Sequence, residues 1–226
     1  MARPEQERAP AADKRGLFIA LEGGEGSGKS SQAQALKTLL EAKGYSVTVT
    51  REPGGCELGE RVRKLLSESS LALDPHSELF LFAAARAQHV GELILPALER
   101  GEIVICDRFS DSSLAYQGHG RGLSLNHVRV VNHIATRGLV PALTVLLNLP
   151  VGMGLARKER EASPDRIGQE GREFHERVHR GYLAIAAEEP ERFLVVDATL
   201  PAAEITQKIW DRAEPLLSAA CGLAHA

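Results

Sequence analysis

Cysteine is scarce in this sequence. The three cysteines among 226 residues, Cys56, Cys106 and Cys221, show neither CxxC pairing nor the spacing of metal ligands. This argues against a secreted disulfide scaffold and is typical of proteins from a reducing cytoplasm. Cys106 ends a short apolar run, so we expect it to be a buried core residue.

The sequence also lacks long apolar runs and an excess of positive charge. No stretch approaches the roughly 18 apolar residues that a membrane span needs, and the first fifteen residues have no apolar segment of the kind found in secretory signals. The net charge is -3, whereas a protein that wraps duplex nucleic acid needs a large positive surface. We therefore expect a soluble cytoplasmic protein without membrane or nucleic-acid partners, which binds phosphate through a local cluster of cations.

Five short apolar runs alternate with longer amphipathic segments. The runs are continuous, as in parallel strands that are buried on both faces, and they cover residues 17–21, 47–49, 103–106, 143–149 and 193–196. Helical patterns cover residues 29–43, 58–68, 76–99, 124–137, 151–160, 171–189 and 201–217. This order predicts right-handed crossovers and an α/β fold, with a five-stranded parallel sheet and helices on both of its faces.

The length of the chain suits one α/β domain. We assign this domain to residues 16–217, between a disordered N-terminal tail (1–15) and a C-terminal tail (218–226). Residues 157–171 are rich in Arg, Glu, Gly and Pro, which is typical of a solvated loop. In a phosphotransferase, such a segment would instead serve as a short closing lid.

The strongest motif is GGEGSGKS at residues 23–30, which matches G-x-x-x-x-G-K-[ST] at every fixed position. It lies between a predicted strand and a predicted helix, which is the context of a phosphate-binding P-loop. Glycines let consecutive backbone N–H groups converge on phosphate oxygens, and the helix adds its positive N-terminal end. We expect Lys29 on the β- and γ-phosphates and Ser30 on Mg²⁺. The residues predicted to bind ATP are Gly23, Gly24, Glu25, Gly26, Ser27, Gly28, Lys29, Ser30 and Ser31.

A second element of a nucleotide site is the apolar run that ends in Asp107. A strand ending in Asp is typical of a Walker B element, whose carboxylate holds Mg²⁺ directly or through water. By itself the pattern is weak, because Asp also caps helices and turns. Arg108 follows, and its guanidinium is suited to bind a second phosphate bidentately.

Several classes of P-loop protein compete for this pattern. A GTPase needs an N-K-x-D guanine reader, which the sequence lacks, and the D-x-x-G at 165–168 follows no predicted strand. A motor or transport ATPase would usually carry an acid after Asp107, where this chain has Arg108. A non-catalytic nucleotide-binding module needs no acceptor site. A small-molecule kinase needs a second phosphate site, which Arg108 supplies.

Further residues fit such an acceptor site. Residues 51–55 follow the second strand, at the carboxyl edge where open α/β sheets bind ligands. Arg63 lies on the next helix, where a solvated surface position is the simpler interpretation. Phe82 and Arg86 are four residues apart and share a helix face, so the ring could stack on a nucleobase while the guanidinium donates to a carbonyl. The alternative for Phe82 is a core position.

The chain resembles the bacterial thymidylate kinases along nearly all of residues 17–217. The stretches that carry the resemblance are LEGGEGSGKSS, TREPGG, LFAAARAQH, CDRFSDSSLAYQG, DRIGQE and VDAT. The resemblance implies a three-layer P-loop NTPase fold, ATP and dTMP as substrates, Mg²⁺ as cofactor and a homodimer. It implies the reaction of ATP with dTMP to give ADP and dTDP, a step of the dTTP pathway.

The resemblance also implies roles for individual residues. Phe82 would stack on thymine and Arg86 would donate to a base carbonyl. Arg63 and Arg108 would hold the acceptor phosphate, and Tyr116 would lie close to the sugar C2′ and disfavour a ribose hydroxyl. Glu25 and Glu52 would approach the sugar 3′-OH, the metal or the phosphates. The implied dTMP site is Glu25, Glu52, Arg63, Phe82, Arg86, Arg108, Ser112, Ser113, Tyr116 and Gln117, with Ser113 and Gln117 as polar contacts to the base.

A catalytic arginine comes from the P-loop or from the lid in this family. The P-loop here contains no arginine, so the resemblance points to the lid, where Arg166 is our first candidate and Arg160 the second. We expect Arg157 to support the end of the preceding helix. The implied catalytic set is Lys29, Asp107, Arg108, Arg160 and Arg166, with Ser30 and Asp107 as metal ligands.

The chain departs from the family pattern in three places. Cys56 stands where a small or hydroxylated residue is expected, Asn148 stands where family members often have Asp, and the first fifteen residues have no counterpart that we recognise. Two alternatives to a thymidylate kinase stay open: a kinase of another nucleoside monophosphate (UMP, CMP or AMP), and a non-catalytic P-loop module. ADP release with Mg-ATP against a panel of monophosphates would separate them.

Overall fold

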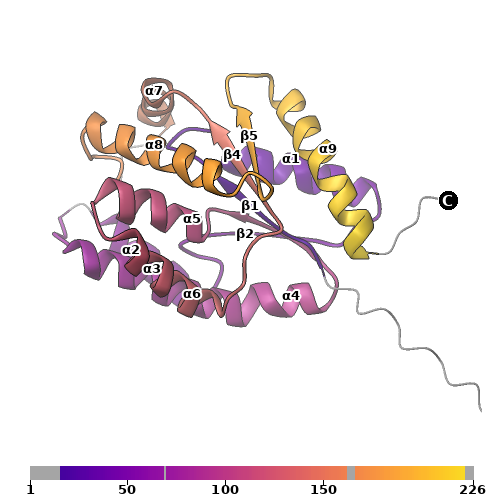
Figure 1. The fold of residues 1–226 in the computed structure, drawn as a ribbon, viewed down its shortest axis with the longest axis horizontal. Helices are drawn as coiled ribbons and strands as arrows, with labels where there is room; N and C mark the ends of the chain where they lie inside the picture. Colours follow the sequence, from indigo (N-terminus) through magenta and orange to yellow (C-terminus); the bar gives the residue numbers. More distant parts are fainter. Residues whose placement is uncertain (1–15, 69, 162–165, 222–226) are drawn as a thin grey trace, which may run out of the picture.

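The computed structural model describes residues 16–68, 70–161 and 166–221. The expected N-terminal tail, residues 1–15, lies outside the described residues. A five-stranded sheet forms the centre of the fold, and every strand pair in it is parallel. The strands lie in the order β2-β3-β1-β4-β5 and are β1 (Phe18–Glu22), β2 (Val47–Arg51), β3 (Ile103–Asp107), β4 (Leu143–Asn148) and β5 (Phe193–Asp197). Helices lie on both faces of the sheet (Figure 1), so the predicted three-layer α/β fold is confirmed.

The burial of each strand follows its place in the sheet. All five residues of β1 are buried, as are the apolar residues of β3 and β4, because helices cover both faces there. The edge strands β2 and β5 keep exposed positions. The continuous apolar runs of the sequence therefore mark the central strands most strongly.

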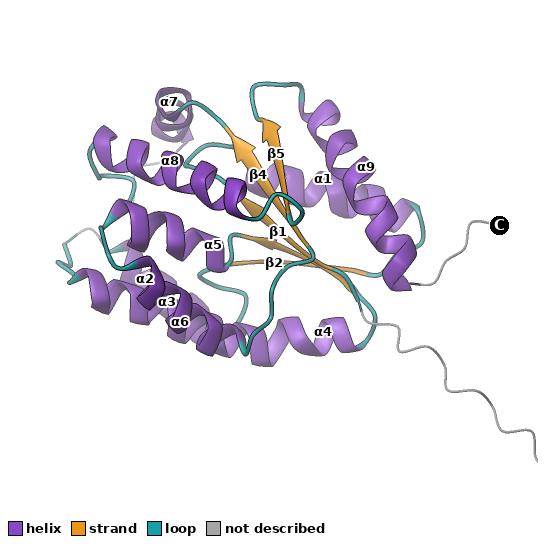
Figure 2. Cartoon of the chain, in the orientation of Figure 1, coloured by secondary structure: helices purple, strands orange, loops and turns teal. Residues whose placement is uncertain are grey.

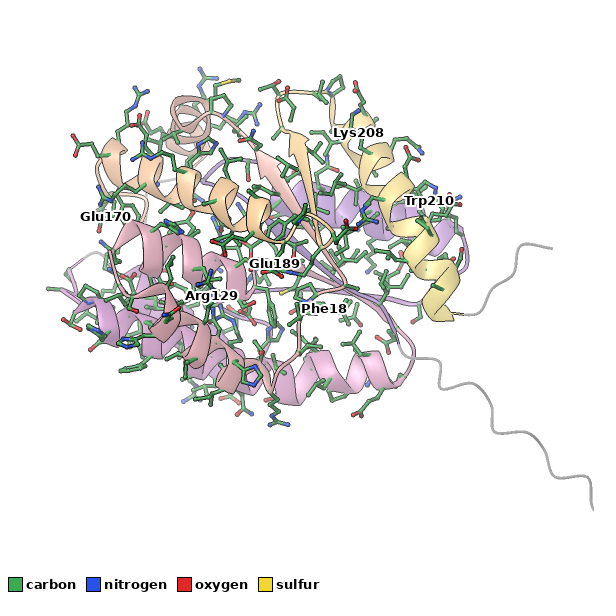
Figure 3. The ribbon with its side chains drawn as sticks, viewed as in Figure 1. Phe18, Arg129, Glu170, Glu189, Lys208 and Trp210 are labelled. Atoms are coloured by element: carbon green, nitrogen blue, oxygen red, sulfur yellow. The ribbon has the colours of Figure 1, made fainter. Side chains whose placement is uncertain are left out.

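Two helices cover one face of the sheet: α1 (Lys29–Ala42) and α9 (Ala202–Cys221). Leu36 and Leu40 of α1 and Ile209 of α9 pack with the strands in one hydrophobic cluster, beside Trp210 (Figure 3). The other face is covered by α3 (Pro75–His89), η1 (Val90–Ile94), α4 (Leu95–Glu99), α5 (Ser110–Ser113), η2 (Leu114–Gly120), α6 (Leu125–Thr136) and α8 (Arg172–Glu188). Helices α2 (Glu57–Ser67) and α7 (Val151–Glu161) lie nearer the carboxyl ends of the strands (Figure 2).

The structure differs from the sequence-based expectation in three places. The helix predicted over 76–99 is α3, a π-helical turn and α4, because Pro96 has no N–H to continue the regular ladder. The helical segment 110–120 was not predicted, since its Ser and Gly residues have low helix propensity. Helix α9 continues to Cys221, so residues 218–221 of the expected C-terminal tail are helical, and residues 222–226 lie outside the described residues.

The strand order determines at which edge of the sheet a ligand can bind. The chain leaves β1 for β2 on one side and later returns to β4 on the other, so the strand order reverses beside β1. Open α/β sheets bind ligands at the carboxyl ends of the strands next to such a reversal. The loop after β1 is the predicted P-loop, and Asp107 ends the neighbouring β3. None of the helices in the described ranges offers an apolar stretch of the length that a membrane span requires.

Candidate active site

The P-loop forms the floor of the candidate site. Gly28 precedes α1 with φ 91°, a left-handed conformation that favours glycine and lets the loop turn directly into the helix. Lys29 is folded back over the loop, and its Nζ donates to the carbonyl oxygens of Gly23 (3.1 Å) and Gly24 (2.8 Å) and to Ser27 Oγ (3.2 Å). Burial lowers the pKa of Lys29 to about 8. The lysine therefore lies where phosphate oxygens would replace its carbonyl partners.

Ser30 and Asp107 meet at the mouth of the P-loop, although 77 residues separate them. The hydroxyl of Ser30 donates to Asp107 Oδ2 at 2.6 Å. Helix α1 supplies the serine and the end of β3 supplies the carboxylate, so the sheet pairing of β1 with β3 brings them together. A hydroxyl and a carboxylate are hard oxygen donors, the type that Mg²⁺ prefers.

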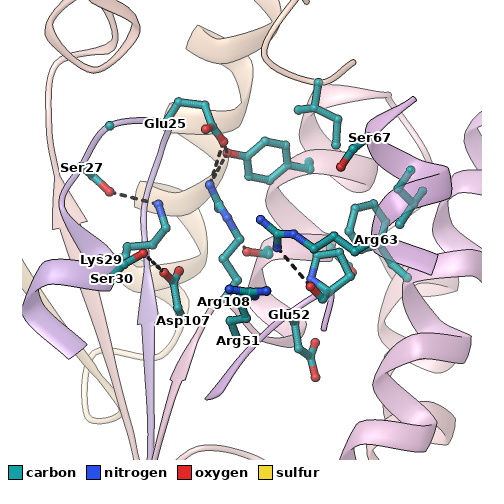
Figure 4. Close-up of a pocket in the computed structure, with 18 of the residues that line it drawn as sticks. Glu25, Ser27, Lys29, Ser30, Arg51, Glu52, Arg63, Ser67, Asp107 and Arg108 are labelled. Carbon is teal, nitrogen blue, oxygen red and sulfur yellow. Dashed lines mark hydrogen bonds and ion pairs between the residues drawn. The ribbon is translucent and has the colours of Figure 1, made fainter. Parts of the chain in front are cut away.

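Arg108 lies between the P-loop and the opposite wall of the site (Figure 4). Its Nη1 donates to the carbonyl oxygen of Gly23 at 3.0 Å, while its Nη2 donates to Glu25 Oε1 at 2.9 Å and to Tyr116 Oη at 3.1 Å. Its backbone has φ 69°, which is uncommon for a residue with a side chain and concentrates at functional sites. Burial opposes the charge of Glu25, but Arg108, Lys29 and Lys158 lower the pKa of this carboxyl to about 2.

A cleft of about 360 Å³ continues from the P-loop to α2, α3 and the 110–120 segment. Arg63 lies on its far side, where Nη1 donates to the carbonyl oxygen of Pro53 at 3.1 Å, and Phe82 faces the same cleft. Of the residues predicted to contact dTMP, nine line the cleft: Glu25, Glu52, Arg63, Phe82, Arg108, Ser112, Ser113, Tyr116 and Gln117. Of those predicted to contact ATP, seven line it: Glu25, Gly26, Ser27, Gly28, Lys29, Ser30 and Ser31.

Arg86 lies behind the wall of this cleft. It is 1% exposed, and its guanidinium donates to Glu52 Oε2 (2.7 Å), Ser113 Oγ (3.0 Å), Asn132 Oδ1 (2.7 Å) and the carbonyl oxygen of Phe109 (3.1 Å). A buried guanidinium needs such partners because its charge is costly to desolvate. In this structure Arg86 therefore holds four segments together, including the pocket residue Ser113.

Glu52 belongs to a second buried group, with His89 and Cys106, whose possible ligand atoms lie within 4.8 Å of one another. Each of these three side chains already has a hydrogen-bond partner within the protein. The two ring nitrogens of His89 bond Glu52 Oε1 (3.0 Å) and Thr50 Oγ1 (2.7 Å), and the Cys106 thiol donates to the carbonyl oxygen of Arg108. We interpret this group as a hydrogen-bond network that stabilises the loop after β2. The predicted burial of Cys106 is confirmed.

The cations of the predicted lid occupy three different positions. Arg157 lies at the P-loop, where its Nη1 donates to the carbonyl oxygen of Gly26 at 3.3 Å. Arg160 is exposed. Arg166 packs against the acceptor side instead, with Nη2 2.7 Å from Glu78 Oε2 and Nε donating to the carbonyl oxygen of Leu66. Residues 162–165 lie outside the described residues.

The sequence analysis missed three residues that the fold brings to the site. Glu22 is completely buried and accepts from the backbone N–H groups of Phe109 and Ser112 and from the hydroxyls of Ser112 and Tyr182. Burial raises its pKa to about 7. Lys158 lies 4.0 Å from Glu25. Glu22 adjoins the P-loop motif and could have been noticed, whereas Tyr182 lies 160 residues further along and leaves no local signal.

Comparisons with known proteins agree on one family. A family model described as thymidylate kinase matches residues 21–209. The chain is 53% identical to a thymidylate kinase of Deinococcus radiodurans, over 87% of this chain and 95% of that protein. It is 50% identical to one from a Synechococcus species, over 90% and 98%. A crystal structure of thymidylate kinase from Ehrlichia chaffeensis superimposes with a TM-score of 0.71 at 33% identity, covering 87% of this chain and 98% of that one.

Proposed function

The chain belongs to the thymidylate kinase family and uses ATP to phosphorylate dTMP, and from this premise we propose how its own residues divide that work. The observation that carries the proposal is the position of Arg108. One guanidinium bonds both the P-loop, at Gly23 and Glu25, and the acceptor wall, at Tyr116. A cation there lies between the two phosphates that the reaction must align.

Lys29, Ser30 and Asp107 form the donor side. Lys29 binds the β- and γ-phosphates, which replace the carbonyl partners that it has now. Ser30 and Asp107 would hold Mg²⁺, because their oxygens, 2.6 Å apart, are a suitable pair of hard donors. The ion, when bound, neutralises charge on the phosphates. The backbone N–H groups of residues 23–31 and the N-terminus of α1 complete the ATP site.

The wall opposite the P-loop is the dTMP site. Arg63 and Arg108 hold the acceptor phosphate, Phe82 stacks on the base, and Tyr116 packs against the sugar. Ser113 and Gln117 bond the edge of the base, and Ser112, Glu25 and Glu52 complete the site. Arg86 acts mainly through its bond to Ser113, since it lies behind the wall. The acceptor phosphate is already anionic, so the reaction depends on alignment and charge neutralisation.

A cation from the lid completes the catalytic set. The position of Arg157 favours it for this role, because its guanidinium already donates to the carbonyl oxygen of Gly26 in the P-loop. Arg166, the first choice from the sequence, and Arg160 stay as alternatives that would have to move toward the phosphates. A guanidinium there stabilises the charge that spreads over the transferring phosphoryl group. Closure of the lid also excludes water, which would otherwise compete with dTMP as acceptor.

An assay of ADP release tests the acceptor. Mg-ATP is supplied with dTMP, dUMP, dCMP, UMP, CMP or AMP in separate reactions, and Mg-ATP alone measures hydrolysis. We expect dTMP to give the highest kcat/KM. Equal turnover of dCMP and dTMP would reject the proposed base contacts, and ADP release that is independent of any monophosphate would reject the acceptor site as a whole.

A homodimer through α3 and α6 is the assembly that we propose. These helices pack together and leave Phe80, Val130 and Ile134 57%, 59% and 71% exposed. Large apolar side chains left exposed on two neighbouring helices are the kind of surface that a partner subunit would cover. Ile134→Asp should give a monomer in light scattering, while Val195→Asp, on the edge strand β5, should not. A dimeric Ile134→Asp variant would place the interface elsewhere.

The cytoplasm is the location that we propose. Cys56 and Cys106 are buried free thiols, as expected in a reducing compartment.

A further inference from the structure

Glu78 is a buried carboxylate that does not line the cleft. It lies on α3, one turn before Phe82, and its side chain is 1% exposed. Oε1 accepts from Gln117 Nε2 at 2.8 Å and from Arg121 Nε at 3.2 Å, while Oε2 lies 3.1 Å from Arg121 Nη2 and 2.7 Å from Arg166 Nη2. A carboxylate between two guanidinium groups is ionised at neutral pH.

This ionised carboxylate decides which end of the Gln117 amide faces it. An ionised carboxylate only accepts hydrogen bonds, so Gln117 must present its NH₂ group to Glu78. The carbonyl oxygen of Gln117 is then left for the cleft, which Gln117 lines. Among the described residues, no other group bonds this side chain, whose residue is 1% exposed. Burial opposes the charge of Glu78, but hydrogen bonds from Arg121 and Gln117 lower its pKa, which keeps the amide in one orientation.

Ser113 lies four residues earlier on the same helical segment. Its hydroxyl has the opposite hydrogen-bonding role toward the cleft, that of a donor. Arg86 has only N–H donors, and its Nη1 donates to Ser113 Oγ at 3.0 Å. The hydroxyl hydrogen of Ser113 is thereby left to donate toward the cleft, which Ser113 also lines. The wall thus presents an acceptor from Gln117 beside a donor from Ser113.

We propose that Glu78 is a positioning residue that sets base specificity by fixing Gln117 as a hydrogen-bond acceptor. The thymine edge offers N3–H as a donor beside the C4 carbonyl as an acceptor, which matches this wall. Cytosine offers the reverse pattern, an unprotonated N3 beside an amino group. The inference rests on the proposed acceptor site, and it assigns discrimination against cytosine to a residue that touches neither base.

The test is the Glu78→Gln variant, which keeps the shape and removes the charge. A neutral amide can donate as well as accept, so Gln117 would be free to rotate and bond either base. We expect the ratio of kcat/KM for dTMP to that for dCMP to fall at least about tenfold, within the range of one mismatched buried hydrogen bond. The ratio of dTMP to dUMP should not change, because uracil has the same edge.

Two controls separate this role from a general loss of structure. Glu170→Gln removes the other carboxylate partner of Arg121 and leaves Gln117 untouched, so the dTMP to dCMP ratio should not change. In a Gln117→Leu background, Glu78→Gln should have no further effect on that ratio. An unchanged ratio in Glu78→Gln, or an equal fall in the Gln117→Leu background, would overturn the proposal. Wild-type protein that lacks dTMP-dependent ADP release would instead reject the proposed function.

A measurement on the wild-type protein covers the case in which Glu78→Gln does not fold. The side-chain NH₂ signals of Gln117, labelled with ¹⁵N and assigned by their loss in Gln117→Leu, should exchange slowly with solvent. They should stay protected and nearly unshifted when dTMP binds, because the NH₂ group points away from the base. Rapid exchange in the free protein, or a large shift on dTMP binding, would contradict the assigned orientation.

Discussion

Helix α7 packs so closely on the P-loop that Gly154 has no room for a side chain. A Cβ added at Gly154 would lie 2.2 Å from the carbonyl oxygen of Glu25, and one added at Gly26 would lie 2.4 Å from the carbonyl oxygen of Gly154. Real Cβ contacts are essentially never under 3.0 Å, so Gly154→Ala must separate the helix from the loop by at least 0.8 Å. This separation displaces the P-loop, which ends at Lys29, relative to the helix that carries Arg157.

A displacement of this size should be seen in catalysis. Misplacement of reacting groups by about 1 Å costs up to 10²-fold in rate. We therefore expect Gly154→Ala to lower kcat about 10- to 100-fold and to raise the KM for ATP. The helix gains up to about 1 kcal/mol from the alanine, which the overpacking cost of about 1–3 kcal/mol should offset or exceed. ADP release and thermal unfolding measure the two effects.

Gly152→Ala is the matched control. It makes the same substitution one half-turn earlier in α7, where an added Cβ meets no atom within 4 Å. It should keep wild-type kcat and KM and leave stability the same or slightly higher. If Gly154→Ala behaved like Gly152→Ala in both assays, the close contact would have no part in holding the P-loop, and the reasoning would be refuted.

Three further predictions follow from the site. Lys29→Ala should lower kcat at least about 10²-fold in the ADP-release assay; turnover within a few-fold of wild type would reject Lys29 as the phosphate ligand. Arg157→Ala should lower kcat at least about 10²-fold with only a few-fold change in the KM for dTMP, and the same pattern in Arg166→Ala alone would move the catalytic role to that residue. Burial raises the pKa of Glu22 to about 7, from 4.5, so the folded chain retains a proton that the unfolded chain releases. The free energy of unfolding should therefore decrease as the pH rises from about 4.5 to 7. The Glu22→Gln variant, which cannot titrate at this position, should lack this decrease. Equal pH slopes for both proteins in urea denaturation would contradict the assignment.

Local patterns in the sequence determined the donor half of the site. The P-loop motif needs only a strand, a glycine-rich turn and a helix in succession, and all three are local. The five apolar runs similarly predicted the parallel sheet, because burial on both faces requires continuous apolar segments. Asp107 and Arg108 could be placed from the same logic, since the carboxyl ends of neighbouring parallel strands meet at one edge.

Only the tertiary structure decided which of the acceptor residues face the cleft. The spacing of Phe82 and Arg86 placed both on one helix face, yet Phe82 lines the cleft and Arg86 lies behind it. The spacing says nothing of Glu52, Ser113 and Asn132, which come from other segments and enclose the guanidinium.

Local patterns also could not predict the positions of the lid arginines or the partners of the buried ionisable side chains. Arg157 and Arg166 are nine residues apart, and only packing sends one to the P-loop and the other to Glu78. Glu22 and Tyr182 meet across 160 residues, because the fold brings the end of β1 and a residue of α8 into one hydrogen-bond group with Ser112. Residue types and short spacings determine which groups a segment can offer, whereas the directions in which those groups point, and the partners that hold them, depend on contacts between segments that are distant in sequence.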